Sequence, residues 1–455
     1  MIIHKLDNVE VNLKDGHKYA LCDIKAGENI IKYGNPIGHA TIDIKKGEHV
    51  HSHNVKTNLS EQLEYTYEPV EVPKIKADAE RTFMGYVRAN GEVGIRNEVW
   101  IVNTVGCVNK IAKTLSKRTG AICFEHPFGC SQLGDDQAVT QKILKGLVNH
   151  PNAAGVLVLG LGCENNNIEE FKKVLGTYDE RRVRFLNCQD VTDEIEVGIS
   201  IIKELQEYAD TFNRTPVPVS KLKLGLKCGG SDGFSGITAN PLVGRVSDKL
   251  ISLGGSCVLT EVPEMFGAEH LLMQRCKDKE TFEKTVALIN NFKAYFTKHD
   301  QVIYENPSPG NKAGGITTLE EKSLGCIQKG GDSEVVAVLN YGDTLQENGL
   351  SLLNGPGNDI VAITNLTAAG VHMVLFTTGR GTPLGGPVPT VKIATNRNLA
   401  EKKANWIDYD ASGLLEKDLT DDFFDYILSV ASGLETKNEI NDYREISIFK
   451  DGIVL

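Results

Sequence analysis

The sequence predicts an α/β protein in which a small β-rich module precedes two α/β domains with largely parallel sheets. Three observations predict this class. The first sixty residues contain short β-type runs separated by glycine turns. From residue 83 onward, apolar runs alternate with amphipathic helical patterns, which is typical of βαβ units. Several apolar runs also end in a glycine-flanked cysteine, as expected where strands open into loops at one edge of a sheet.

Residues 1–60 are expected to form the β-rich module. Two Lys-x-Gly-Glu turns, at residues 25–28 and 45–48, form a small internal repeat, and each precedes a β-type run. The β-type runs occupy residues 9–13, 30–33 and 49–51. Residues 61–82 are polar and contain two prolines, so we expect an extended connector there.

Residues 83–215 are predicted to form the first α/β domain. Its apolar strand candidates occupy residues 99–103, 121–124 and 155–159. Helical patterns cover residues 108–116 and 139–148, and in the second of these the apolar side chains share one face. Alternation of this kind predicts parallel strands joined by helices.

A proline-rich segment, Arg214–Pro218, marks the boundary to a second α/β domain at residues 216–455. Strands are predicted at residues 221–226, 256–260, 334–339 and 371–376. Helices are predicted near residues 242–253 and 279–296. The chain after residue 410 is expected to be helical and then extended.

Composition argues against several classes of protein. The formal net charge of the 455 residues is −11 and no lysine or arginine block occurs, so we expect no nucleic-acid partner. The sequence shows no signal-peptide pattern and no apolar stretch long enough to span a bilayer, so we expect no membrane partner. Ten cysteines in a large chain of this kind indicate reduced thiols, and the expected location is the cytoplasm.

Four cysteines follow predicted strands. They are Cys107, Cys130, Cys163 and Cys228. Thiolates at strand ends are ligands for an iron–sulfur cluster or a transition metal. We take Cys130, Cys163 and Cys228 as the main candidates and Cys107 as a further one. Three cysteines that leave one iron open suit the removal of a hydroxyl group. No C-x-x-C motif is present, and buried structural thiols beside tight turns are the alternative.

Three histidines alternate at His49, His51 and His53, so a strand there would place the imidazoles on one face. Imidazole binds iron, manganese or zinc, and it also acts as a general base near neutral pH. His51 and His53 are therefore candidate catalytic residues and metal ligands. Solvated histidines on a sheet edge are the alternative.

Polar segments supply candidate substrate ligands. Residues 311–323 are expected to be a polar loop that offers Lys312, Thr317 and Thr318 to a carboxylate and hydroxyl groups. A second loop follows the strand at residues 371–376, and its candidates are Thr377, Thr378 and Arg380, with Lys392 on the next strand. After Cys228, the sequence Gly-Gly-Ser-Asp offers backbone N–H groups and Asp232, a candidate metal ligand or base. Each of these segments is also compatible with a solvated turn.

Taken together, these motifs resemble the altronate/galactarate dehydratase family of sugar-acid hydro-lyases. The resemblance spans essentially the whole chain and includes residues 32–34 and 51–54 of a SAF-type N-terminal domain. It is further carried by residues 85–88, 94–97, 228–232, 309–315, 376–383 and 387–390.

The resemblance implies that D-altronate loses water to give 2-dehydro-3-deoxy-D-gluconate, with dependence on Fe²⁺ or Mn²⁺. A base removes the proton beside the carboxylate, and metal or cationic groups stabilise the charge that develops. We expect His51 or His53 as base or ligand, with Arg380 and Lys312 anchoring the carboxylate. A [4Fe–4S] cluster on the strand-end thiols is the alternative cofactor.

Other functions stay open at this point. Galactarate is an alternative substrate, and a sulfo-lyase acting on a sulfonated hydroxy acid is a more distant enzyme function. A non-catalytic sugar-acid sensor is an alternative of another class. The expected partner is a small sugar acid, and the sequence leaves self-association into a homo-oligomer open.

Overall fold

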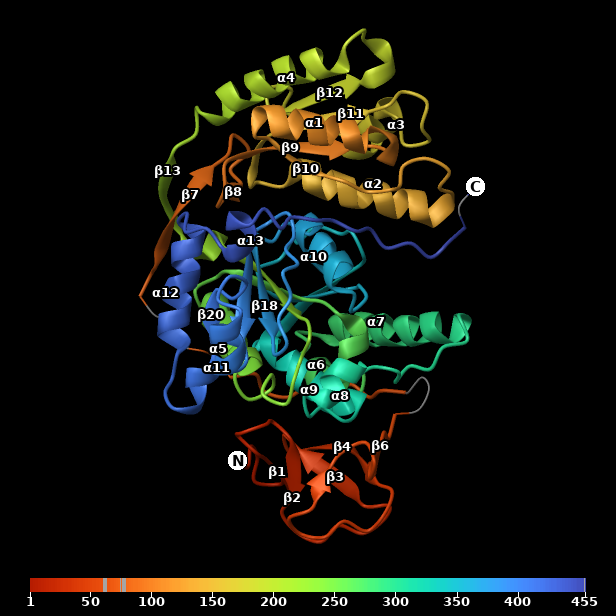
Figure 1. Ribbon diagram of the computed structural model, residues 1–455, viewed down its shortest axis with the longest axis vertical. Helices are drawn as coiled ribbons and strands as arrows, with labels where there is room; N and C mark the ends of the chain where they lie inside the picture. Colours follow the sequence, from red (N-terminus) through yellow and green to blue (C-terminus); the bar gives the residue numbers. More distant parts are fainter. Residues whose placement is uncertain (60–63, 74, 76–78, 454) are drawn as a thin grey trace.

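The computed structural model describes residues 1–59, 64–73, 75, 79–453 and 455. Three regions follow one another along its longest axis, with the N-terminal domain at one end (Figure 1). The region built around β18 (Met373–Thr378) lies in the middle and is called the third domain below. The region that contains β9 (Glu98–Asn103) lies at the other end and is called the second domain. The predicted fold class is confirmed.

The N-terminal domain consists of two three-stranded sheets with the strand orders β1-β2-β5 and β3-β4-β6. Its strands are β1 (Val9–Val11), β2 (Lys18–Ala20), β3 (Asn29–Lys32), β4 (Asn35–Ala40), β5 (His49–Val50) and β6 (Val55–Lys56). Alternating residues such as Val9, Ile30 and Ile37 are buried between the sheets. The internal repeat is visible in two matching ion pairs, because Lys25 contacts Asp43 and Lys45 contacts Asp23, each at 2.9 Å.

The predicted connector at residues 61–82 is only partly described, since residues 61–63, 74 and 76–78 lie outside the described residues. Its described part runs along the third domain. There the Val70 amide donates to the Gln274 carbonyl at 3.0 Å, and Tyr67 packs on Phe282 with ring centroids 5.1 Å apart.

The second domain is a four-stranded parallel sheet with the order β10-β9-β11-β12. The strands besides β9 are β10 (Ile122–Phe124), β11 (Ala153–Gly160) and β12 (Val183–Asn187). The helices are α1 (Asn109–Thr119), α2 (Gly134–Asn149), α3 (Ile168–Leu175) and α4 (Glu194–Ala209). Every residue of β11 is buried, as expected for a central strand of a parallel sheet covered on both faces.

The boundary segment predicted from its prolines is itself a strand. β13 (Arg214–Pro218) pairs antiparallel with β7 (Thr82–Val87), which also pairs with β8 (Val93–Gly94). Proline is tolerated here because β13 lies at the edge of this small sheet. Both passages of the chain between the second and third domains therefore run side by side.

The third domain is a seven-stranded parallel sheet with the order β16-β17-β15-β14-β18-β19-β20. The strands besides β18 are β14 (Lys223–Cys228), β15 (Ser256–Leu259), β16 (Val335–Leu339), β17 (Gly349–Leu353), β19 (Thr390–Ala394) and β20 (Tyr409–Asp410). Its first helices are α5 (Ala239–Ser252), α6 (Glu269–Met273), α7 (Lys279–Lys298), α8 (Pro309–Ala313) and α9 (Leu319–Cys326). The later ones are α10 (Asp359–Ala368), α11 (Arg397–Lys402), α12 (Thr420–Ala431) and α13 (Lys437–Ile440).

The two faces of the large sheet belong to two different cores. Met373 and Leu375 belong to a core that includes α5 and the N-terminal domain, whereas Val374 and Phe376 belong to a core that includes α10 and the second domain. At the second contact α2 approaches α10 closely, because a Cβ at Gly146 would lie 2.5 Å from the Ala368 carbonyl oxygen. The three regions are thus joined by continuous apolar cores.

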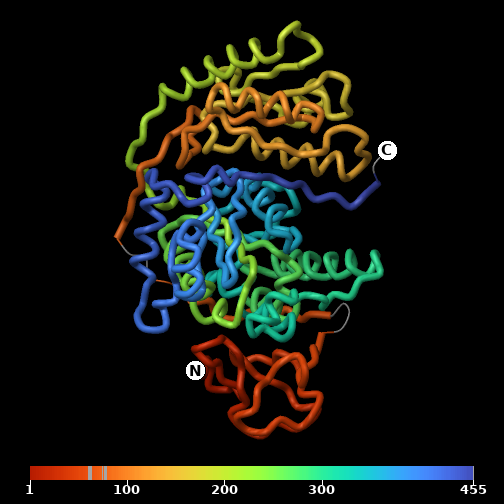
Figure 2. Tube along the Cα trace, in the orientation of Figure 1, coloured from red at the N-terminus to blue at the C-terminus, as the bar shows by residue number. Residues whose placement is uncertain are grey.

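The chain after α13 is extended and runs between the second and third domains (Figure 2). Ile446 and Ile448 are buried in the core that those two domains share. Arg444 forms an ion pair with Glu98 of β9 at 2.8 Å, and the backbone amides of Asp451 and Gly452 donate to the Asp136 carboxylate. The C-terminal segment therefore ties the last residues of the chain to the second domain.

One predicted element is wrong. Residues 311–323 were expected to form a polar loop, but most of them lie in α8 and α9. A capping box at Ser308 starts α8, and the Thr318 side chain caps α9. All eight residues of α9 are buried, so its polar side chains face protein partners rather than solvent.

In the described part of the chain, no helix combines the length and the apolar character needed to cross a bilayer.

Candidate functional site

The candidate site lies where the N-terminal domain meets the carboxyl ends of β14, β18 and β19. Backbones from the two sides touch there: a Cβ at Gly233 would lie 2.0 Å from the Gly16 carbonyl oxygen. The Gly233 amide also donates to the Gly314 carbonyl at 2.7 Å, which joins the loop after β14 to the end of α8. Any side chain at position 233 would therefore separate the domains. In an open α/β fold this edge of the sheet is where ligands bind.

Four histidines of the N-terminal domain gather at this contact. Nδ1 of His17 lies 3.0 Å from Nε2 of His49, and the His49 ring stacks on His51 and His53 with centroids 5.4 and 5.6 Å away. His17, His49 and His51 are half-buried and His53 is exposed, so solvent reaches the group. We call these four residues the histidine cluster.

The strand expected at residues 49–53 is shorter than predicted. β5 ends at Val50, and the Asn54 side chain then turns the chain by accepting from the His51 amide and donating to the His49 carbonyl, both at 2.9 Å. The turn nevertheless keeps the rings of His51 and His53 beside His49. His17, on the preceding β1–β2 turn, completes the group and lies 32 positions before His49.

His51 connects the histidine cluster to the third domain. Its Nε2–H donates to the Lys312 carbonyl at 2.9 Å, and its Nδ1 lies 2.9 Å from the Ser52 hydroxyl. Burial lowers the pKa of His51, and burial together with the neighbouring imidazoles lowers the pKa of His49. Both rings are therefore neutral at pH 7, the form that binds a metal or accepts a proton.

Two cations at this edge of the third domain have no ion-pair partner among the described residues. They are Lys312 on α8 and Arg380 in the loop after β18. Arg380 lies against the loop after β14, since a Cβ at Gly230 would be 3.2 Å from the Arg380 Cβ. Buried loop residues connect the two cations, with Gly314 packed on Asp232 and Asp232 packed on Gly379. These cations are the available ligands for a carboxylate.

Asp232, predicted as a base or metal ligand, is buried and accepts several hydrogen bonds. Its donors are the Phe234 amide, the Ser235 and Thr395 hydroxyls and the Asn396 side chain, at 2.9–3.1 Å. Burial raises the pKa of its carboxyl group. With its oxygens occupied in this way, Asp232 holds together the loops that follow β14 and β19.

The remaining predicted substrate ligands also make internal contacts. The Thr317 hydroxyl donates to Glu321, Thr318 caps α9, Thr377 donates to Asn240 and the Thr378 oxygen accepts from the Gly381 amide. Lys392 donates to the Thr382 and Leu384 carbonyls, and burial lowers its pKa to about 8. These side chains shape the loops around the site, and Arg380 is the exposed polar group that those loops present.

Beneath the loops lies a group of buried charges that the sequence did not reveal. Lys227 contacts Glu261 and Asp359, Lys322 contacts Glu264 at 2.9 Å, and Lys329 contacts Glu261 at 3.5 Å. Glu261 has a φ of 71°, a left-handed conformation that a glutamate adopts at a cost. We call this group the buried ion network.

Cys228 belongs to the buried ion network. Its Sγ lies 3.3 Å from Sγ of Cys326, and both sulfur atoms lie 3.1 Å from Oε2 of Glu264. Burial alone would raise the pKa of Glu264, but the cations of Lys322, Lys227 and Lys329 lower it well below its usual range. The contact with Cys228, together with burial, raises the pKa of Cys326 well above its usual range.

The four predicted cysteine ligands therefore divide between two places. Cys228 lies in the third domain with Cys326 and Glu264, whereas Cys107, Cys130 and Cys163 are exposed at the carboxyl edge of the second domain's sheet. The structure does not bring Cys228 together with Cys130 and Cys163, because they follow strands of different sheets. It also does not bring any of these thiols to His51 and His53, whose contacts are with other histidines, Ser52 and Lys312.

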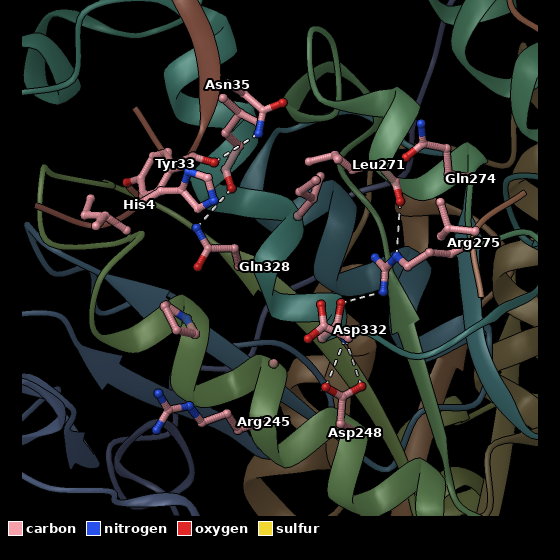
Figure 3. A pocket seen from close by; sticks show the side chains of 17 residues that line it. His4, Tyr33, Asn35, Arg245, Asp248, Leu271, Gln274, Arg275, Gln328 and Asp332 are labelled. Atoms are coloured by element: carbon pink, nitrogen blue, oxygen red, sulfur yellow. Dashed lines mark hydrogen bonds between the residues drawn. The ribbon is translucent and has the colours of Figure 1, made fainter. Parts of the chain in front are cut away.

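Figure 3 shows a separate cavity of about 490 Å³ that His4, Tyr33 and Asn35 line from the N-terminal domain. Arg245 and Asp248 of α5 lie on its other side. Three of its charged side chains already have partners: Arg245 contacts Asp418, Arg275 donates to main-chain carbonyls and Asp248 accepts from main-chain amides. We therefore place the candidate site at the histidine cluster.

Three family models match the chain in succession. Residues 1–58 match the altronate/galactarate dehydratase SAF domain, and residues 85–210 match the second domain of D-galactarate dehydratase/altronate hydrolase. Residues 219–454 match the D-galactarate/altronate dehydratase C-terminal model. The chain belongs to the altronate/galactarate dehydratase family. The family membership predicted from the motifs is confirmed.

Relatives within the family match over nearly their full length. A protein of Escherichia coli named altronate dehydratase is 54% identical, with 100% of this chain and 99% of the relative covered. An altronate dehydratase of Bacillus subtilis is 55% identical, with 98% and 93% covered. Galactarate dehydratase (L-threo-forming) of Escherichia coli is 33% identical, with 93% and 86% covered. This member of the family is thus a hydro-lyase.

Residues whose role depends on distant partners were not predictable from the sequence. His17 is isolated in the sequence, and its signal is only a histidine in a glycine turn. Lys227, Glu261 and Glu264 lie among apolar residues of strand ends, where a buried charge requires an opposite charge nearby. Charged residues within otherwise apolar strand ends are therefore the sequence feature that could have predicted the buried ion network.

Proposed function

We propose that the protein dehydrates D-altronate to 2-dehydro-3-deoxy-D-gluconate. The observation that carries this proposal is the identity of 54–55%, over almost the entire length, to two proteins named altronate dehydratase. The site geometry supports it, since imidazoles with lowered pKa values contact the Lys312 backbone at a ligand-binding edge of the sheet. The loop that carries Arg380 lies at the same edge. A galactarate dehydratase is the second candidate, because a relative of that name is 33% identical over most of the chain.

In this proposal, Arg380 and Lys312 hold the substrate carboxylate. A guanidinium can form two parallel hydrogen bonds to a carboxylate, and the lysine ammonium adds a point charge. The loop after β14 lies beside Arg380. Its Gly229 and Gly233 amides donate to the Thr377 and Gly314 carbonyls, and its exposed Gly230 faces Arg380. The carboxylate end of a sugar acid is thereby directed toward the histidine cluster.

The histidine cluster offers two ligand atoms to a divalent iron or manganese ion. Its donors are imidazole nitrogens, two of which lie 3.0 Å apart, and the group is reached by solvent. His17 and His49 would hold the ion through these two nitrogens, since His51 already donates from Nε2 to the Lys312 carbonyl. An ion bound there would supply Lewis-acid stabilisation of substrate oxygens.

Proton transfer is assigned to the neutral histidines. His51 removes the proton from the carbon beside the carboxylate through Nδ1, while its Nε2–H stays on the Lys312 carbonyl. The cations of Arg380 and Lys312 offset the negative charge that grows on the carboxylate. The proton then passes to the departing hydroxyl of the next carbon, water leaves, and the enol becomes the ketone. Atoms balance as loss of one water.

The test is a turnover screen with purified protein loaded anaerobically with Fe²⁺ or Mn²⁺. We expect a 2-keto-3-deoxy product from D-altronate, with kcat/KM at least about tenfold higher than for galactarate. His51→Gln should reduce kcat by about a hundredfold or more, whereas His39→Gln, a histidine of the same domain that contacts Asn58, should leave it unchanged. Tight binding without a product would reject the enzyme function, and product from galactarate alone would select the second candidate.

We further propose that the protein works in the cytoplasm with a small sugar acid as its partner. All ten cysteines are free thiols, which suits a reducing compartment. The net charge of −11 does not favour nucleic acid as a partner.

A further inference from the structure

Three exposed cysteines follow three neighbouring strands of the second domain. The strand order is β10-β9-β11-β12, and Cys130, Cys107 and Cys163 follow β10, β9 and β11 in that order across the sheet. Parallel neighbours lie about 4.8 Å apart, so their loops leave the same edge of the sheet side by side. This arrangement is separate from the histidine cluster and from the buried ion network.

Hydrogen bonds tie the three cysteine loops into one rim. The Gly106 amide donates to the Phe128 carbonyl at 2.9 Å, and the Asn166 amide donates to the Gly129 carbonyl at 3.0 Å. The Ser131 amide donates to the Asn165 side chain at 2.9 Å. The loops also approach closely, because a Cβ at Gly129 would lie 1.9 Å from the Thr104 carbonyl oxygen. The positions of the three cysteines relative to one another are thus fixed by backbone contacts.

The residues around the rim are polar, and some of their side-chain atoms lack a hydrogen-bond partner. Oδ1 of Asn103, Nε2 of Gln132 and Oδ1 of Asn187 are buried and have no hydrogen-bond partner among the described residues. Asn103 ends β9 and Asn187 ends β12, while Gln132 lies two positions after Cys130. Gln189 donates from its side chain to Sγ of Cys163 at 3.5 Å. Buried unpaired polar atoms are uncommon, and these three lie on the strand ends and loops of the same sheet edge as the thiols, where a bound group can supply their partners.

The spacing of the thiols distinguishes between kinds of metal group. Among the described residues, the one set of three metal-binding side chains with ligand atoms within 4.8 Å of one another is Cys228, Glu264 and Cys326. The sulfur atoms of the three exposed thiols therefore do not all lie within 4.8 Å of one another, which disfavours one ion shared by all three. The corners of an iron–sulfur cubane hold their thiolates farther apart than one ion does.

We propose that Cys107, Cys130 and Cys163 bind a [4Fe–4S] cluster and leave its fourth iron without a cysteine ligand. The three thiolates come from three adjacent strand ends, and the fourth strand does not supply another: Cys188, which follows β12, is buried in the apolar core. The fourth iron would be open to solvent, because the three thiols are exposed. A small oxygen ligand such as a hydroxy acid can therefore reach it.

Reconstitution of the full-length protein with Fe²⁺ and sulfide under anaerobic conditions tests the site. We expect about four iron and about four acid-labile sulfide per chain, beyond the iron held by the histidine cluster. Cys107→Ser, Cys130→Ser and Cys163→Ser should each lose most of the sulfide. Cys22→Ser, which changes another exposed thiol, should keep it, and so should His49→Gln. A wild-type protein without acid-labile sulfide, or a triple serine variant with unchanged sulfide, would overturn the proposal.

Two further measurements do not depend on the variants. Alkylation of the reconstituted protein should label Cys22 and spare Cys107, Cys130 and Cys163, whereas alkylation before reconstitution should label all four. Mild oxidation with ferricyanide should lower the cluster iron from about four to about three per chain and produce a three-iron paramagnetic signal, since one iron lacks a thiolate. Labelling of the three thiols after reconstitution, or retention of the fourth iron, would contradict the assignment. Sugar-acid turnover is not used as a readout, so failure here is distinct from failure of the proposed function.

Discussion

Arg380 and Lys312 have no ion-pair partner among the described residues, unlike Lys227 and Lys322 of the buried ion network. The contrast with Lys392 is informative. The sequence presented Lys392 and Arg380 as similar candidates on neighbouring segments, but Lys392 is buried and donates to two carbonyls, whereas Arg380 is exposed beside the loop after β14. At the scale of single residues, an exposed and unpaired side chain such as Arg380 can bind a ligand, whereas a buried and hydrogen-bonded one such as Lys392 supports the fold.

Replacement of Arg380 tests this distinction. Arg380→Lys keeps the positive charge but cannot form the two parallel hydrogen bonds of a guanidinium to a carboxylate. The loss of one charge-assisted hydrogen bond costs about 1.5–3 kcal/mol of binding free energy. We expect KM for the sugar acid to rise about tenfold to a hundredfold, with the unfolding midpoint unchanged. Steady-state kinetics beside Arg397→Lys, an exposed arginine on α11, checks the result. Equal KM values in both variants would remove Arg380 from the site.

Helix α9 is the element on which the sequence prediction failed most clearly, and it also joins two domains. Its Glu321 accepts from Lys18 and Lys32 of the N-terminal domain, each at 2.8 Å, and from Thr317. Burial alone would raise the pKa of Glu321, but the two lysine cations lower it well below its usual range. This polar segment was expected to be a substrate-binding loop, because its ion-pair partners, about 300 positions away, are not visible in local patterns.

Substitution of Glu321 should loosen the N-terminal domain. Glu321→Gln leaves two buried ammonium groups without a counter-charge, and breaking a buried pair in this way costs about 3–5 kcal/mol. We expect a lower unfolding midpoint and faster proteolysis within the connector after the N-terminal domain. Asp43→Asn, which removes the exposed partner of Lys25, should change little and serves as the control. Indistinguishable behaviour of the two variants would contradict this account of the domain contact.

At the scale of the whole molecule, the second and third domains share one core and a C-terminal segment that crosses it. α2 packs on α10, and Ile446 and Ile448 insert beside them. His150 donates from Nε2 to the Val371 carbonyl at 2.9 Å, and the Asn152 side chain donates to the His372 carbonyl at 3.0 Å. The interface is therefore both apolar and hydrogen-bonded, and it sets the orientation of the two sheets.

Truncation of one tail side chain tests the shared core. Ile448→Ala removes buried methyl groups and should lower the free energy of unfolding by about 2–4 kcal/mol. Ile453→Ala, on the same segment but exposed, should change it by less than about 0.5 kcal/mol. Denaturant unfolding with fluorescence and circular dichroism measures both. A similar loss in the two variants would mean that the tail does not contribute through burial.

The same interface predicts a dependence of stability on pH. Burial lowers the pKa of His150 to about 3 and the pKa of His372 well below its usual value, so both are neutral in the folded protein. Below about pH 6.5 only the unfolded chain binds these protons, and each histidine then lowers the unfolding free energy by about 1.4 kcal/mol per pH unit. Stability should therefore be full above pH 6.5 and decrease as the pH falls towards 3.

The measurement is the slope of unfolding free energy against pH between pH 6.5 and 5. His150→Phe keeps an aromatic ring against Trp100, where the His150 ring stacks at 5.3 Å, and should reduce the slope by about 1.4 kcal/mol per pH unit. His39→Gln should leave the slope unchanged. Equal slopes in wild type and His150→Phe would contradict the assignment of a buried neutral histidine.

The sequence by itself determined the fold class, the order of strands and helices along the chain, and the family. Apolar periodicity and glycine turns act over a few residues, so elements such as β9, β14 and α7 were predictable from local patterns. The gathering of His49, His51 and His53 was also predictable, because these residues are close in the chain.

Only the tertiary structure decided which candidate catalytic residues and metal ligands share a site. It placed His17 beside His49, assigned Cys228 to Cys326 and Glu264, and left Cys107, Cys130 and Cys163 together at another sheet edge. These contacts depend on the order of strands in each sheet and on the docking of whole domains. Strand order and docking are set by packing between distant segments, and no short stretch of sequence encodes them.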